Sequence, residues 1–137
     1  MLDKAAYHSR WDHIEQIQRE HSNLPESGVE NRAALHKVLT NTFREFVITC
    51  YCDYWRYAYQ SAAFSLISER DVLIARAIKA HHWTPGIAAS LSNYDLALSL
   101  IDELAAFKLT EMAIHVSYMN LQDLPKADYQ ALIEPHE

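Results

Sequence analysis

The sequence predicts an all-α protein, and two observations lead to this prediction. Only Gly28 and Gly86 are glycine among the 137 residues, and no proline interrupts residues 26–84. Hairpins and sheets need turn residues that adopt positive φ, and this chain has almost no place for such turns. We therefore expect one all-helical domain over residues 1–137, a bundle of five to seven helices with one long central helix.

Apolar spacing predicts the first helix at about residues 2–21. Tyr7 and Trp11 begin a stripe of side chains that recurs every three or four residues, as on one buried helix face. Pro25 and Gly28 then indicate a loop.

The second expected helix is unusually long. Ser27 stands three residues before Glu30, the capping-box spacing, and apolar side chains then recur every three or four residues from residue 31 to about 67. A straight helix of that length would span roughly 55 Å at 1.5 Å per residue. We expect either a kink near residues 40–42 or 49–53, or a central helix around which the others pack.

Capping signals also mark the helices of the second half. Ser68 and Ser92 each stand three residues before an aspartate, and Thr84 with Pro85 has the pattern of an N-cap followed by a first-turn proline. Thr110 precedes a further apolar run. The expected helices cover about residues 69–82, 85–91, 93–107, 111–120 and 125–133.

Composition restricts the class of protein. The chain is 50% hydrophobic and 22% charged, which is typical of a folded globular protein. No apolar run approaches the ~18 residues that span a bilayer, and the first residues lack the layout of a signal peptide. Cys50 and Cys52 would point about 200° apart on a helix, so we expect free thiols, which agree with a cytoplasmic location. Because no apolar run is long enough to span a bilayer, we expect no membrane association.

The formal net charge of −6 comes from the C-terminal third. Residues 1–91 carry ten basic and ten acidic side chains, whereas residues 92–137 carry two basic and eight acidic ones, which gives −6. Binding to nucleic-acid phosphates requires clustered Lys and Arg, so we expect no nucleic-acid partner. The acidic end favours a basic protein partner, or is a solvated surface.

A cluster of aromatic residues is the densest unusual feature. It consists of Tyr51, Tyr54, Trp55, Tyr57 and Tyr59. One buried helix stripe cannot hold all five, so some must lie near the surface, either packed between helices or in contact with a partner or a second copy of the chain.

These features together favour a protein-binding function. The candidate binding residues are the five aromatic ones with Asp95, Asp102, Glu103 and Glu111. The leading hypothesis is a non-enzymatic, acidic helical inhibitor of the immunity type that neutralises a basic partner. The alternatives are a homodimer and a domain that senses a small ligand in a pocket lined by Trp55 and the tyrosines.

A different function class is suggested by Arg76 and His81. With four residues between them and Trp83 following, they resemble the Arg-x4-His-x-Tyr signature of the HEPN family, which are small all-helical RNases. The resemblance implies metal-independent RNA cleavage, with Arg76 and His81 catalytic across a dimer interface. Ala77 and Trp83 depart from that family's usual residues. Alternatively, His81 and His82 close a helix, where imidazoles interact well with the carbonyl end of the dipole.

We expect no cofactor and no metal site. His8 with Asp12, and Glu111 with His115, are pairs one turn apart that helical surfaces often contain. The two cysteines lack a second pair at zinc spacing, and two glycines cannot form a phosphate-binding loop.

Overall fold

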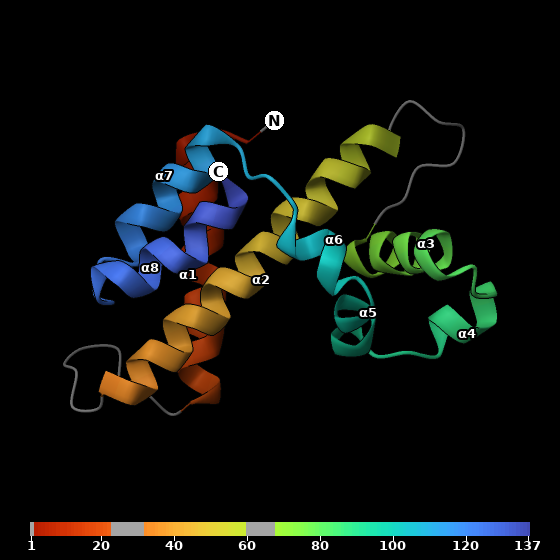
Figure 1. Cartoon of the computed structure of the whole chain (residues 1–137), viewed down its shortest axis with the longest axis horizontal. Coiled ribbons are helices and arrows are strands. Elements are labelled where there is room, and N and C mark those ends of the chain that lie inside the picture. The colour runs from red at the N-terminus through yellow and green to blue at the C-terminus, as the bar shows by residue number, and fades with distance from the viewer. Residues whose placement is uncertain (1, 23–31, 60–67) are drawn as a thin grey trace. The chain divides into compact units, whose positions relative to one another are not determined.

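A computed structural model describes residues 2–22, 32–59 and 68–137, which contain eight α-helices, one 3₁₀ helix and no strand (Figure 1). The all-α prediction is confirmed, with slightly more helices than expected. In chain order these are α1 (Lys4–His21), α2 (Arg32–Tyr59), α3 (Glu69–His81), α4 (Pro85–Ala89), α5 (Asn93–Ser99), α6 (Ile101–Ala105), α7 (Glu111–Asn120), α8 (Lys126–Ile133) and η1 (Glu134–His136).

Side-chain caps determine where most of these helices begin. Asp3 accepts a hydrogen bond from the backbone amide of Ala6 at 2.8 Å and so caps α1. The predicted caps Ser68, Thr84, Ser92 and Thr110 each accept in the same way from the amide three residues later. Each cap satisfies one of the amides that a helix start leaves without a partner.

Several helix ends differ from the sequence-based expectation, and two of them show a specific backbone geometry. The helix expected over residues 93–107 is divided at Leu100, whose φ of −105° and ψ of 17° depart from α geometry. At the end of α3, His82 adopts the left-handed conformation with φ of 57°, and its amide donates to the carbonyl of Ile78 at 2.8 Å. A non-glycine residue therefore provides the helix end that glycine usually provides.

The long helix α2 matches the predicted central helix. It runs without a break from residue 32 to 59, which is about 42 Å at 1.5 Å per residue. Both places considered for a kink are therefore helical. Thr42 is fully buried in α2, and its hydroxyl donates to the carbonyl of Val38 at 2.7 Å, so that this polar group has a partner in the core.

Some expectations lie outside the described residues. These are the loop at Asn23, Pro25 and Gly28, the capping box of Ser27 and Glu30, and the part of the long helix beyond residue 59.

The chain divides into two compact units. Unit 1 contains residues 1–47 and 108–137, and unit 2 contains residues 48–107. The single domain expected over residues 1–137 stays a prediction. No helix in the described ranges is both long and apolar enough to cross a membrane.

Aromatic side chains form much of the core of unit 1. The ring of Trp11, which is fully buried, has its centroid 6.4 Å from that of Phe43 and 5.1 Å from that of Phe46. His136 of η1 is also buried and packs edge-on against Phe43. Its carbonyl accepts a hydrogen bond from the amide of Leu109 at 2.9 Å, which fixes the C-terminal segment within unit 1.

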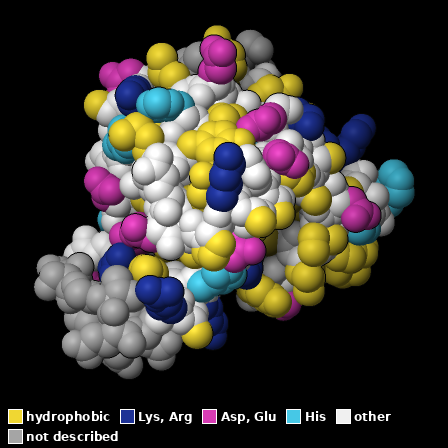
Figure 2. All heavy atoms as spheres, turned by 60° about the vertical axis from the view of Figure 1, so that its left-hand side comes forward, with side chains coloured by type: hydrophobic (Ala, Val, Ile, Leu, Met, Phe, Trp, Pro, Cys, Tyr) yellow, Lys and Arg dark blue, Asp and Glu magenta, His cyan; other side chains and the backbone are white. Residues whose placement is uncertain are grey.

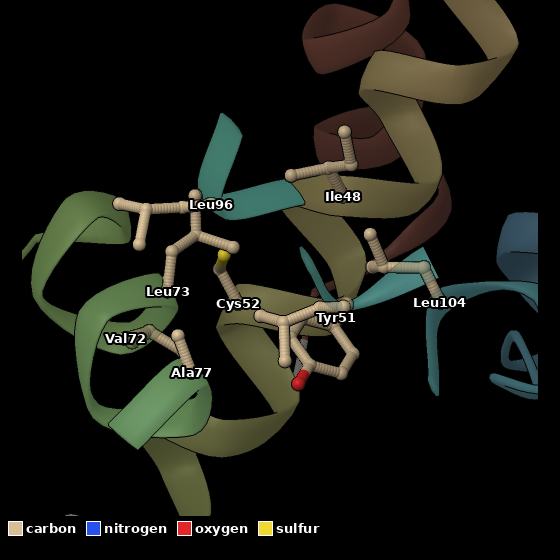
Figure 3. Close-up of a cluster of buried hydrophobic side chains, with 9 residues drawn as sticks. Ile48, Tyr51, Cys52, Val72, Leu73, Ala77, Leu96 and Leu104 are labelled. Carbon is tan, nitrogen blue, oxygen red and sulfur yellow. The ribbon is translucent and has the colours of Figure 1, made fainter. Parts of the chain in front are cut away.

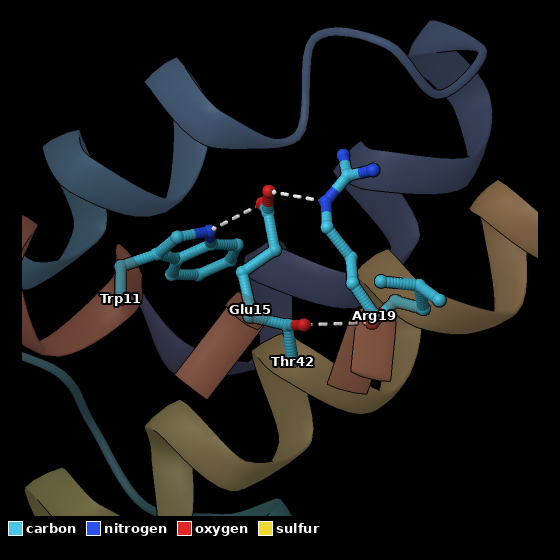
Figure 4. A network of polar contacts seen from close by, with 5 residues as sticks. Trp11, Glu15, Arg19 and Thr42 are labelled. Atoms are coloured by element: carbon cyan, nitrogen blue, oxygen red, sulfur yellow. Dashed lines mark hydrogen bonds and ion pairs between the residues drawn. The ribbon is translucent and has the colours of Figure 1, made fainter. Parts of the chain in front are cut away.

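One carboxylate satisfies the polar atom of the buried tryptophan. Glu15 accepts hydrogen bonds from the indole nitrogen of Trp11 at 3.2 Å and from Nε of Arg19 at 3.0 Å (Figure 4). Since a buried indole N–H needs a partner, this contact lets α1 place a tryptophan in the core.

The core of unit 2 is smaller and aliphatic apart from one tyrosine and one cysteine. Figure 3 shows the buried cluster, which contains Ile48, Tyr51, Cys52, Val72, Leu73, Ala77, Leu96, Leu100 and Leu104. Both cysteines are buried free thiols. Burial raises the pKa of the Cys52 thiol to about 12, so this group stays protonated at neutral pH.

Candidate functional site

The two short helices α5 and α6 bury one leucine stripe in the core of unit 2. Leu96, Leu100 and Leu104 recur every four residues, and all three are buried. All three belong to the same buried cluster, although the helix is divided at Leu100. This stripe packs beside α3 and fixes which side of α5 and α6 faces outward.

The same helices carry a second apolar stripe, which faces solvent. Tyr94, Leu98 and Ile101 are 68%, 51% and 56% exposed. Within α5, Tyr94 and Leu98 are four residues apart and share one helix face, on a different side from the buried Leu96. Ile101 is the first residue of α6, just after the division at Leu100. Apolar side chains that gather on one exposed face often mark an interaction site, whereas scattered ones do not.

Two exposed carboxylates are sequence neighbours of these apolar residues. Asp95 follows Tyr94 and Asp102 follows Ile101 by one residue, and both aspartates are exposed. Neither forms an ion pair with another residue in the described ranges. We call the set of Tyr94, Asp95, Leu98, Ile101 and Asp102 the α5–α6 surface. It combines apolar area with unpaired negative charge.

The predicted acidic residue next to this surface, Glu103, already has a partner. Its Oε1 accepts hydrogen bonds from Nε and Nη2 of Arg76 at 3.1 and 2.8 Å. Both side chains are partly buried, and the pair joins α6 to α3. Glu103 therefore contributes to the folded structure of unit 2, unlike Asp95 and Asp102.

Arg76 is also enclosed by aromatic side chains of α2. Its guanidinium carbon lies 3.7 Å from the centroid of the Trp55 ring, within cation–π range, and Nη1 donates to the Tyr59 hydroxyl at 3.5 Å. Burial alone would lower the pKa of Arg76, but the contacts with Tyr59, Tyr51 and Glu103 raise it overall. The guanidinium therefore stays charged and fully engaged.

The five aromatic residues are thus divided among three environments. Tyr51 is in the core, with its hydroxyl buried and without a hydrogen-bond partner in the described part of the chain. Burial, and after it the nearby Glu103, raises the pKa of Tyr51. Trp55 and Tyr59 contact Arg76, whereas Tyr54 and Tyr57 are 56% and 73% exposed. Only these last two remain available to a partner.

His81 lies in a different environment from Arg76. Its Nε2 is 2.7 Å from the carbonyl oxygen of Ser99, and its ring stacks on Trp83 with centroids 4.5 Å apart. The two residues of the RNase resemblance are about 140° apart around α3, at 100° per residue. Because Glu103 holds Arg76, these contacts add no support to a phosphate-binding role for it.

The remaining predicted residue, Glu111, lies in unit 1, in the first turn of α7. It is exposed. Among the residues that the structure describes, no three His, Cys, Asp or Glu side chains come together in a group that could hold a metal ion.

Sequence reasoning found the two aspartates of the α5–α6 surface but missed its apolar residues. The available signal was a second run of apolar side chains, at Tyr94, Leu98 and Ile101, out of phase with the leucine stripe. Periodicity alone does not say which of two stripes is buried. Only the packing against α3 decides it.

Comparison with protein-family models, with curated proteins and with solved structures gives no match for this chain. The candidate site is therefore defined by its own geometry. On the face drawn in Figure 2, acidic side chains are spread over the surface and hydrophobic side chains lie among them.

Proposed function

We propose that this chain is a non-enzymatic, cytoplasmic protein-binding domain, an acidic helical inhibitor of the immunity type that neutralises a basic partner. The α5–α6 surface carries the proposal. It combines three exposed apolar side chains with two unpaired carboxylates on the consecutive short helices α5 and α6 of unit 2. Protein interfaces combine such a desolvated apolar centre with charged groups at its edge.

The apolar residues supply the affinity in this proposal. Tyr94, Leu98 and Ile101 each keep about half or more of their surface in water. Covering that remainder would contribute roughly 1 kcal/mol per side chain, given about 25 cal/mol for each Å² of apolar area. Tyr54 and Tyr57 offer further aromatic contact area in the same unit.

In this proposal the acidic side chains increase the rate of association and the selectivity for a basic partner. A net charge of −6 attracts a basic protein over a distance, and Asp95 and Asp102 then meet its Lys or Arg side chains at contact. Such attraction is screened by salt, so the complex should form more slowly at high ionic strength.

The test is capture of a partner from the native host by the tagged chain at low and at high salt, with identification by mass spectrometry. We expect a stoichiometric basic protein whose association slows at high salt. The double variant Asp95→Lys, Asp102→Lys should slow association about tenfold. The matched control, Asp12→Lys with Asp123→Lys, changes the net charge by the same amount at two exposed positions of unit 1.

Two results would contradict the proposal. One is a partner bound equally fast by the wild-type chain and the double variant. The other is a homodimer with no protein partner, which would favour the RNase hypothesis and call for RNA cleavage assays of Arg76→Ala and His81→Ala.

A further inference from the structure

The start of α5 is held by one arginine of α3. Nη1 of Arg70 donates to the side-chain oxygen of Asn93, the first residue of α5, at 2.7 Å. Nη2 of the same guanidinium donates to the backbone carbonyls of Ala89 and Leu91, both at 2.8 Å. These acceptors lie 19 to 23 residues after Arg70, where α4 ends and α5 begins. One side chain therefore fixes the connection that leads into α5.

The end of α5 is held by a histidine of the same helix α3. Nε2 of His81 lies 2.7 Å from the carbonyl oxygen of Ser99, the last residue of α5. Because a carbonyl oxygen can only accept, Nε2 must carry the proton and donate in this bond. Carbonyls at a helix end lack an intrahelical partner, and the division at Leu100 places Ser99 at such an end. The ring of Trp83, stacked on His81, supports the imidazole in this position.

The helix α5 needs these contacts because it is short and has little buried surface of its own. It contains seven residues, and isolated helices of fewer than about 12 residues are marginal in water. Leu96 is its only buried residue. Three of the five residues of the α5–α6 surface nevertheless lie on α5, namely Tyr94, Asp95 and Leu98. The arrangement of that surface therefore depends on how firmly α5 is held.

We propose that Arg70 and His81 are positioning residues that keep α5, and with it the α5–α6 surface, in the arrangement that a partner recognises. Neither residue belongs to the surface itself. This inference rests on the protein-binding function proposed above. If α5 opened for part of the time, the apparent affinity for a partner would fall in proportion to the fraction of chains in which α5 is closed. Contacts at both ends of α5 keep that fraction high.

The first test measures amide hydrogen exchange in α5, and it needs no partner. Arg70→Met keeps the apolar stem and removes all three donated hydrogen bonds, so the amides of Leu96 and Leu98 should exchange roughly tenfold faster or more. Arg70→Lys should also raise their exchange, because an ammonium group does not reproduce the planar fork of donors. Amides in the middle of α3 should keep the wild-type rates.

Two variants of His81 test the other end of α5. His81→Phe keeps a ring that can stack on Trp83 but has no donor, so it should speed exchange of the Leu100 amide, which donates to the carbonyl of Ala97 at 3.0 Å. His81→Gln offers an amide N–H in place of the Nε2 proton, so it should keep exchange close to the wild-type rate. Equal exchange in the two variants would mean that the bond to Ser99 does not hold α5.

The second test measures the affinity for the basic protein that the wild-type chain captures at low salt in the experiment above. Arg70→Met makes the chain more negative by one charge, which by itself would strengthen binding of a basic protein. The proposal expects the opposite, a complex that is roughly tenfold weaker. Lys79→Met is the matched control, because it removes an exposed cation of α3 that has no hydrogen bond or ion pair in the described part of the chain. It should not weaken binding.

Three results would overturn the proposal for Arg70. In the first, the α5 amides of Arg70→Met exchange at the wild-type rate. In the second, exchange rises equally in α3 and α5, so that Arg70 stabilises unit 2 as a whole. In the third, α5 exchanges faster but the affinity is unchanged. A wild-type chain that captures no basic protein would instead contradict the proposed function, whereas the exchange test would still decide whether Arg70 and His81 hold α5.

Discussion

The guanidinium of Arg76 lies 3.7 Å from the centroid of the Trp55 ring while the same group pairs with Glu103. One side chain of α3 thus connects α2 with α6. Neither partner lies near Arg76 in sequence, so this contact forms only when unit 2 folds. The stability of unit 2 should depend on it.

Replacing Glu103 should destabilise the chain. Glu103→Ala leaves the partly buried Arg76 without its counter-charge, which should lower the free energy of unfolding by roughly 1–3 kcal/mol, less than for a fully buried pair because water screens it. Chemical denaturation measures this. Asp102→Ala removes the neighbouring exposed carboxylate and should change stability by no more than about 0.5 kcal/mol. Equal effects of the two variants would contradict a structural role for Glu103.

The Trp55 ring should stabilise the folded state through the contact of its π face with Arg76. Trp55→Phe keeps an aromatic ring beneath Arg76, although one that attracts a cation more weakly, whereas Trp55→Leu has no ring there. The unfolding free energy of Trp55→Leu should therefore be lower than that of Trp55→Phe by about 0.5–1 kcal/mol. The comparison uses thermal and urea unfolding of both variants. If Trp55→Leu were as stable as Trp55→Phe, the contact between the guanidinium and the aromatic face would not stabilise the protein.

Two leucines near the division between α5 and α6 should differ strongly in how much stability their truncation removes. Leu100 is 2% exposed and Leu98 is 51% exposed. Leu100→Ala should therefore cost about 2–5 kcal/mol of unfolding free energy, and Leu98→Ala no more than about 0.5 kcal/mol. A large loss in Leu98→Ala would mean that the exposed stripe is part of the core and not a binding surface.

Alkaline pH should destabilise unit 2 because its buried thiol, Cys52, ionises. Burial raises the pKa of Cys52 from 9.0 in the unfolded chain to about 12 in the folded one, so the folded state favours the neutral thiol. This contribution is fully present below pH 9 and is lost as the pH rises toward 12. Thermal unfolding followed over that range should show a steeper loss for the wild type than for Cys52→Ala. Parallel curves would contradict it.

The parts of the fold that depend on local chemistry could be predicted from the sequence. Ser68 and Ser92 were identified as helix caps because the bond they accept comes from an amide only three residues away. The Arg76–Glu103 pair joins residues 27 apart, and no spacing rule indicates it. The division at Leu100 was missed as well, because the apolar period continues across it.

The candidate site was only half predictable for a related physical reason. Charge is visible in the sequence, so Asp95 and Asp102 were found. Exposure of Tyr94 and Leu98 depends on which stripe the rest of unit 2 covers, and that is settled by packing. Tyr51 was assigned to binding although it is buried, since aromatic density by itself does not distinguish core from surface.

The helix α2 supplies side chains to both cores, Phe43 and Phe46 to unit 1 and Tyr51 and Cys52 to unit 2. Helices in proteins are stabilised mainly by the packing of their apolar faces. If one unit opened, its half of α2 would lose that packing and begin to fray into the half that the other unit needs. The two units should therefore melt together, in one cooperative transition, and neither should persist when it is expressed alone.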